Sequence, residues 1–139
     1  MIEPYISSSI ARSDPELTSL LFSEFNNLDD LKDRITKGIN LTADSFYGSQ
    51  GRIDDNFIDE NIGIIDKLST KYENAQSMEM ETFQLLHLAY CSRAPIFASS
   101  AAIVVANRRT GNVIDGDTLH QLEVSGGRAI LEAITKLSL

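Results

Sequence analysis

The segment that decides the fold class is Ile96-Phe-Ala-Ser-Ser-Ala-Ala-Ile-Val-Val-Ala106, because almost all of its residues are small or β-branched. Such a run is typical of a strand that is buried on both faces. Helical patterns flank it: apolar residues recur at three- and four-residue spacing over 14–28 and 119–137. Shorter helices are predicted over 58–68 and from residue 81 to Pro95, which ends the helix. Helices that alternate with short buried strands predict an α/β arrangement.

The other strands are less clearly marked in the sequence. Residues 37–47 are predicted to be a strand that leads into a loop, whereas 75–80 fit either type of element. A sheet of two or three strands has exposed edges, on which Ile103-Val-Val105 would be prone to aggregate. We therefore expect this chain to form part of a larger sheet. Residues 1–13 are serine-rich and indicate a disordered arm or a poorly supported strand.

Composition and charge exclude several classes of function. The chain has 139 residues, which indicates one domain at most, and its net charge of −8 disfavours binding to nucleic acid or to an anionic membrane. One cysteine, Cys91, and two histidines argue against a disulfide framework and against a metal site. The first residues lack the basic and apolar regions of a signal peptide, and residues 94–106 are too short to span a bilayer. A cytoplasmic protein without metal or cofactor is expected.

Three segments carry more polar groups than a plain fold needs, and the first is Asp44-Ser-Phe-Tyr-Gly-Ser-Gln-Gly-Arg52. Gln50 offers both a donor and an acceptor, while Arg52 offers donors only. Together they match a ring in which carbonyls flank an N–H, such as uracil, and Phe46 could stack on its face. The alternative is a solvated loop whose arginine bonds nearby carbonyls.

The second segment is Ser77-Met-Glu-Met-Glu-Thr82. In an extended chain Glu79 and Glu81 project to the same side, where two carboxylates could hold the vicinal diol of a ribose. Met80 or Met78 would then form an apolar wall. Alternatively, the carboxylates belong to the first turn of the following helix, where negative charge favours the helix dipole.

The third segment is Ile103-Val-Val-Ala-Asn-Arg-Arg-Thr110. A buried strand that ends in Asn107, Arg108 and Arg109 places polar groups at its carboxyl end, where open α/β sheets bind ligands. A strand that simply emerges into solvent produces the same pattern.

In this order, the three segments resemble the uridine-phosphorylase branch of the nucleoside phosphorylase family. That family's base-recognition loop, Phe-Tyr-x-Gly-Gln-x-Arg, stands here as Phe46-Tyr-Gly-Ser-Gln-Gly-Arg52. The Glu-Met-Glu ribose motif is Glu79-Met80-Glu81, and the strand end Ile-Val-Asn-Arg appears as Val105-Ala106-Asn107-Arg108. The similarity covers approximately residues 37–137.

The resemblance implies phosphorolysis of uridine to uracil and ribose 1-phosphate, with phosphate as co-substrate. It implies that Phe46 stacks on the base while Gln50 and Arg52 bind its carbonyls and N–H. Ribose would be held by Met80 and Glu81, with Glu79 close by. In the third segment, Val105 and Ala106 would line the base pocket and Arg108 would support it. Asn107 stands where purine-specific relatives carry an aspartate, which implies a preference for pyrimidines. Arg52 and Glu81 are the implied catalytic residues.

The family's phosphate site lies in an N-terminal half that has no counterpart in these residues. The resemblance therefore implies a partial three-layer α/β/α fold with a mixed central sheet, in which residues 1–139 form the C-terminal part of a single domain. The expected partners are uridine, phosphate, and either further copies of the chain or a complementing N-terminal half. Two alternatives stay open: a non-catalytic remnant that binds nucleoside or pairs with a full-length homologue, and a nucleosidase that uses water.

Overall fold

A computed structural model describes residues 5–138 of the chain. The chain divides into two compact units, Met1–Arg12 with Lys37–Ser92 and Ser13–Thr36 with Arg93–Leu139, and each is described by itself. Both contain regular structure, so the α/β class is confirmed. No helix of the described part has the length and apolar character that crossing a membrane requires.

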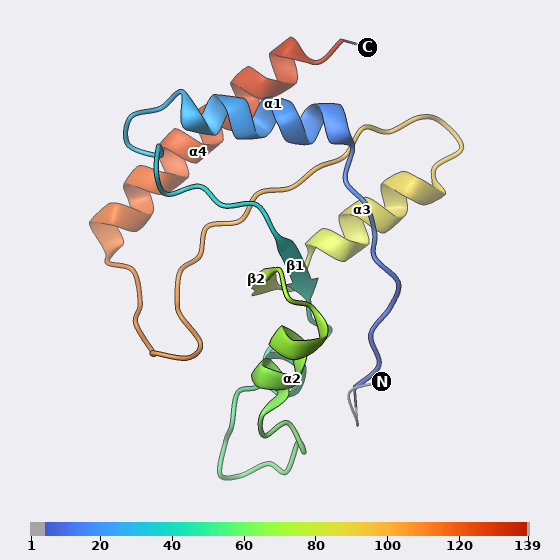
Figure 1. Ribbon diagram of the computed structural model, residues 1–139, viewed down its shortest axis with the longest axis vertical. Coiled ribbons are helices and arrows are strands. Elements are labelled where there is room, and N and C mark those ends of the chain that lie inside the picture. Colours follow the sequence, from blue (N-terminus) through green and yellow to red (C-terminus); the bar gives the residue numbers. More distant parts are fainter. Residues whose placement is uncertain (1–4, 139) are drawn as a thin grey trace. The chain divides into compact units, whose positions relative to one another are not determined.

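The first unit is built on two neighbouring parallel strands, β1 (Ile39–Thr42) and β2 (Ala75–Glu79) (Figure 1). Between them lie a short 3₁₀ turn, η1 (Gly48–Gln50), and helix α2 (Ile64–Lys71). Helix α3 (Thr82–Cys91) follows β2 after a two-residue connection and buries Leu86. Because the strands are parallel and adjacent, the chain leaves both of them at the same edge.

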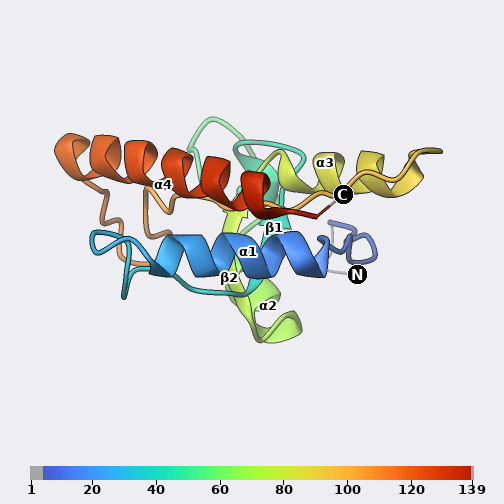
Figure 2. The ribbon, with the colours of Figure 1, turned by 90° about the horizontal axis from the view of Figure 1, so that it is seen from above.

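The second unit pairs helix α1 (Pro15–Asn26) with helix α4 (Gly116–Lys136), which lie side by side (Figure 2). Aspartates cap both helices: Asp14 accepts from the amide of Leu17 at 2.8 Å, and Asp115 from that of Thr118 at 2.9 Å. Lys136 in the last turn of α4 forms an ion pair with Glu24 of α1, with Nζ and Oε1 2.8 Å apart.

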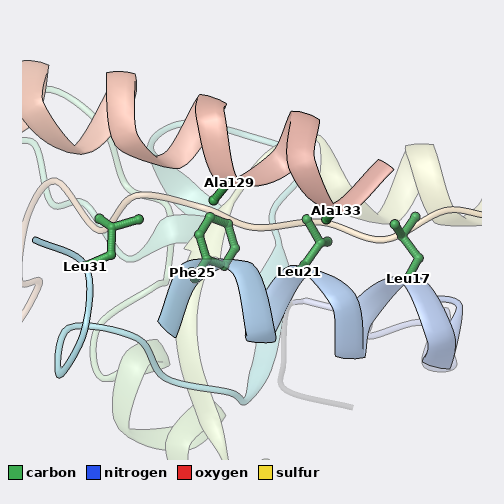
Figure 3. Close-up of a cluster of buried hydrophobic side chains, with 6 residues drawn as sticks. All are labelled: Leu17, Leu21, Phe25, Leu31, Ala129 and Ala133. Atoms are coloured by element: carbon green, nitrogen blue, oxygen red, sulfur yellow. The ribbon is translucent and has the colours of Figure 1, made fainter. Parts of the chain in front are cut away.

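Between these two helices lies the largest apolar core of the described residues. Leucine and phenylalanine side chains of α1 and the following turn meet two alanines of α4, whose small size lets the helices approach closely (Figure 3). Burying each large side chain stabilises the unit by about 1.5–3 kcal/mol. The cluster consists of Leu17, Leu21, Phe25, Leu31, Ala129 and Ala133.

The strand predicted over residues 96–106 is wrong for this structure. Residues 96–105 form no strand, and only Ala106 makes an isolated antiparallel bridge, with Val113. The apolar side chains are also exposed rather than buried on both faces, with Val104 at 57%. Composition can favour the extended backbone, but a strand also needs a neighbouring strand, and none in the described residues pairs with this segment.

Three smaller expectations were also settled by the structure. The helix expected over 58–68 starts later, after Gly63, whose φ of 74° suits glycine and breaks the helical path. The segment 75–80, which fitted either type, forms β2. Two adjacent glycines are unfavourable inside a helix, so Gly126 and Gly127 predict close packing at that point. Both lie inside α4, but no described atom comes within 4 Å of a Cβ built at either, so this close packing is absent from residues 5–138. The predicted third layer and mixed sheet remain predictions.

Candidate active site

The loop that leaves β1 is folded tightly by its own side chains. Ser45 and Ser49 cap each other: each backbone amide donates to the other hydroxyl, at 3.0 and 3.1 Å. Gly51 adopts a φ of 67°, and a Cβ there would lie 2.7 Å from a methyl group of Ile64. A left-handed conformation in a confined space favours glycine. The loop is therefore a defined turn, which places Gln50 and Arg52 together.

Gln50, Arg52 and Phe46 contact one another directly. Arg52 Nη1 donates to Oε1 of Gln50 and to the carbonyl of Phe46, both at 2.5 Å. Its guanidinium lies 3.6 Å from the centroid of the Phe46 ring, a cation–π geometry. The guanidinium thus covers one face of the ring expected to stack on a base. An amide oxygen has two lone pairs, so this bond does not by itself prevent Gln50 from accepting a ring N–H.

Asn61 holds this loop in place, although no motif in the sequence identifies it. Its side chain is 5% exposed, and its amide Nδ2 donates to the carbonyls of Gly48 at 3.1 Å and Arg52 at 2.7 Å. These two carbonyls bracket Gln50. Asn61 therefore stabilises the Phe46–Arg52 loop although it lies outside the loop.

Replacing Asn61 with alanine should destabilise the unit by about 1–3 kcal/mol, because the carbonyl of Arg52 loses a donor and that of Gly48 keeps the amide of Gly51 but loses the Asn61 side chain. Urea denaturation of the parent and the Asn61→Ala variant measures this difference. Asn56→Ala is a matched control, since Asn56 is exposed and bonds only to nearby Asp54. Equal stability of the Asn61 variant and the parent would show that the loop does not depend on this amide.

Glu79, the last residue of β2, has a fully hydrogen-bonded carboxylate. Oε1 accepts from Asn40 Nδ2 at 2.6 Å and Thr42 Oγ1 at 2.5 Å, and Oε2 accepts from the amides of Glu81 and Thr82 at 2.7 Å each. Partial burial raises the pKa of this carboxyl, but the four donors outweigh burial and lower the pKa to about 2.

Glu81 differs from Glu79 although it lies only two residues away. It is exposed, and its Oε2 accepts from the amide of Met80 at 3.2 Å. Met80 and Glu81 lie in the connection between β2 and α3, so the two glutamates are neither in one strand nor in one helix. Of the two carboxylates, that of Glu81 is the more exposed to solvent.

The low pKa of Glu79 predicts how stability depends on pH. A depressed pKa means that the ionised group stabilises the fold above the unfolded value near 4.5, and that this contribution is lost as pH falls toward about 2. Between those limits the free energy of unfolding of the parent should fall more steeply than that of Glu79→Gln, as urea titrations at several pH values would show. Glu73→Gln, at an exposed position, should keep the parent slope.

Two of the three segments meet at one edge of the sheet. The Phe46–Arg52 loop follows the carboxyl end of β1, and Glu79-Met80-Glu81 lies at the carboxyl end of β2 (Figure 1). The amide of Ala43 donates to the carbonyl of Glu79 at 2.7 Å, which ties the two exits together. Carboxyl ends of parallel strands are where open α/β sheets bind ligands.

The third segment belongs to the second unit. Val105 is 48% exposed and Ala106 forms the bridge to Val113. Asn107 caps a tight turn, because its Oδ1 accepts from the amides of Arg109 at 2.9 Å and Thr110 at 3.1 Å. Arg108 and Asn107 thus lie in a turn rather than at the end of a paired strand.

A cavity of about 430 Å³ lies in the first unit, and its lining includes Asp44 and Ser49 of the first polar segment and Thr82 of the second. It runs beside β1 and is lined mainly by apolar side chains, among them Leu41, Met78 and Phe83. Of the residues expected to bind a ligand, only Met78, one of the two candidates for the apolar wall, lines it. Within residues 5–138, no three histidine, cysteine or acidic side chains gather as a metal site requires.

Comparison with known proteins identifies the family. The sequence model of the phosphorylase superfamily matches residues 3–134, nearly the whole chain. The chain belongs to the phosphorylase superfamily. No curated protein matches this phosphorylase-superfamily chain.

A solved structure supports the same family and fold. It comes from a structural and catalytic analysis of two diverse uridine phosphorylases in the oomycete Phytophthora capsici. The two chains are 35% identical and superpose with a TM-score of 0.87, over 95% of this chain and 50% of the other. The phosphorylase-superfamily chain therefore spans about half the length of that structure.

Proposed function

We propose that these residues form the base- and ribose-recognition part of an enzyme similar to uridine phosphorylase. The observation that carries the proposal is the shared edge of β1 and β2, where the Gln50–Arg52 loop and the exposed Glu81 carboxylate both lie. Donors for a base and an acceptor for a sugar diol suit the two halves of a nucleoside. The family match and the uridine phosphorylase structure support this reading.

In the proposed reaction a phosphate oxygen attacks the anomeric carbon of uridine. The bond between that carbon and the ring nitrogen breaks, and its electron pair leaves with uracil, where negative charge spreads onto the carbonyls. Arg52 stabilises this charge more in the transition state than in the substrate, which lowers the barrier. Glu81 accepts hydrogen bonds from the ribose hydroxyls, and Met80 provides the apolar wall beside them.

We further propose that polypeptide outside these 139 residues supplies the phosphate site. The net charge of −8 does not favour an anion, and Arg52 and Arg108 are both allotted to the base. The chain also covers only half of the matched phosphorylase. A complementing half or further copies of the chain would complete the site; phosphate is the co-substrate and no cofactor is required.

A non-catalytic role is the second candidate. The exposed apolar side chains over residues 96–105 favour it, because they suit a surface that pairs with a full-length homologue. Such a protein would bind nucleoside or a partner without turning substrate over. The nucleosidase alternative has no observation of its own.

Calorimetry with uridine and inosine tests the proposed substrate class. The assay uses this chain joined to the part of the matched phosphorylase that it does not cover. Uridine should bind more tightly, because Gln50 and Arg52 suit a ring with two carbonyls and Asn107 has no acidic proton for a purine nitrogen. Tighter binding of inosine would overturn the assignment, and binding of uridine without turnover would favour the non-catalytic role.

A further inference from the structure

The two glutamates of the Glu79-Met80-Glu81 motif are not equivalent in their contacts. All four donors around Glu79 come from the protein itself, two on each carboxylate oxygen. Glu81 is exposed, and among the described residues its carboxylate bonds only to the adjacent amide of Met80. A carboxylate that is already saturated with donors has little capacity left for ribose hydroxyls.

Glu79 instead organises the start of α3. Its Oε2 accepts from the amides of Glu81 and Thr82, and Thr42 Oγ1 accepts from the next amide, that of Phe83, at 2.9 Å. The first amides of a helix have no partner within the helix, so side chains must satisfy them. Three consecutive amides are thereby held by side chains of β1 and β2.

Asn40 and Thr42 in turn hold Glu79. Each donates to Oε1, and Ser77 Oγ donates to Oδ1 of Asn40 at 2.7 Å, which fixes the orientation of the Asn40 amide. The chain of bonds thus runs from β1 to the last residue of β2 and then to the backbone that carries Glu81. Its members occupy three elements, so it fixes their relative positions.

We propose that Glu79 is a positioning residue rather than a ribose ligand: held by Asn40 and Thr42, it aims Glu81 through the backbone amides of Glu81 and Thr82. This inference rests on the proposed function, which makes Glu81 the ribose-binding carboxylate. It assigns to Asn40 and Thr42 an effect on ribose affinity that acts through Glu79.

Amide NMR of the 139-residue chain at neutral pH tests the contacts without any ligand. In the parent, the amides of Glu81 and Thr82 should exchange slowly with solvent. Glu79→Gln replaces the charged acceptor by a neutral amide, so in either orientation of the new side chain the amides of Glu81 and Thr82 lose a hydrogen bond to a charged group. Both amides should therefore exchange at least about 10-fold faster. Glu81→Gln should leave them unchanged, as should Thr70→Val, a control in α2.

A double-mutant cycle tests the role toward ribose. Binding of uridine and of 2′,3′-dideoxyuridine is measured for the parent, Glu79→Gln, Glu81→Gln and the double variant. Glu79→Gln should weaken uridine binding by about 10-fold, and Thr42→Val by less, while binding of the dideoxy probe stays unchanged. In the Glu81→Gln background, the Glu79 change should add less than about 2-fold, because the two residues act as one unit.

If the fold-losses of uridine affinity caused by Glu79→Gln and Glu81→Gln multiply in the double variant, Glu79 contacts ribose itself and the inference is overturned. Unchanged exchange of the Glu81 and Thr82 amides in Glu79→Gln would overturn it as well. If the parent binds no uridine, the proposed function fails for the isolated chain, whereas the exchange experiment still decides whether Glu79 holds these amides.

Discussion

Purified alone, the 139-residue chain is expected to release no uracil from uridine in phosphate buffer above the uncatalysed background. Phosphorolysis needs phosphate held against the ribose in attacking geometry, and such positioning is worth about 7–11 kcal/mol of the barrier. The cationic group at the shared edge of β1 and β2 is Arg52, which bonds Gln50 and Phe46 and is assigned to the base rather than to phosphate. Uracil release is followed by its change in ultraviolet absorbance.

Adding the part of the matched phosphorylase that this chain does not cover, in trans or as a fusion, should restore phosphate-dependent turnover. The same mixture made with Glu81→Gln is the control, because it retains the added phosphate site but loses the ribose carboxylate. Robust turnover by the isolated chain would contradict the prediction and reveal an anion site within these residues. Turnover that does not depend on phosphate would favour the nucleosidase alternative.

The second large effect is expected at Arg52. Replacing it with alanine removes the proposed charge-assisted hydrogen bond to the base, which should weaken uridine binding by about 1.5–3 kcal/mol, or roughly 10- to 150-fold. The substitution also releases Gln50 Oε1 from its guanidinium partner. Calorimetry on the completed protein measures the change. An Arg128→Ala variant, altered on α4, should bind like the parent, and an Arg52→Ala variant indistinguishable from the parent would refute the role.

The sequence predicts the two long helices well because their signals are local. Asp14 followed by Pro15 marks the start of α1, and leucines at three- and four-residue spacing give its buried face. The same spacing identifies α4. The strand predicted over residues 96–106 was wrong for the opposite reason. Their composition favours an extended chain, but whether they form a strand depends on residues far away in the sequence.

The candidate site likewise contains residues that the sequence identifies and residues that it does not. The Phe46–Arg52 loop and the Glu79–Glu81 motif can be recognised from spacing, and the structure places both at the exits of adjacent strands. Asn61 and Asn40 could not be recognised, because each is a single polar residue whose partner lies 13 and 39 positions away, respectively. Supporting residues of this kind acquire their role only when the fold brings the segments together.

The packing of α1 against α4 also sets the order of events during synthesis. About 100 residues separate Phe25 from Ala129, its neighbour in the core. At roughly 5–20 residues per second, α1 leaves the ribosome about 5–20 s before its partner helix exists. Throughout that interval Leu17, Leu21 and Phe25 face water on an amphipathic segment, the kind of nascent chain that chaperones retain. The second unit can therefore close only after α4 (Gly116–Lys136) has been made, which is later than the last residues of the first unit.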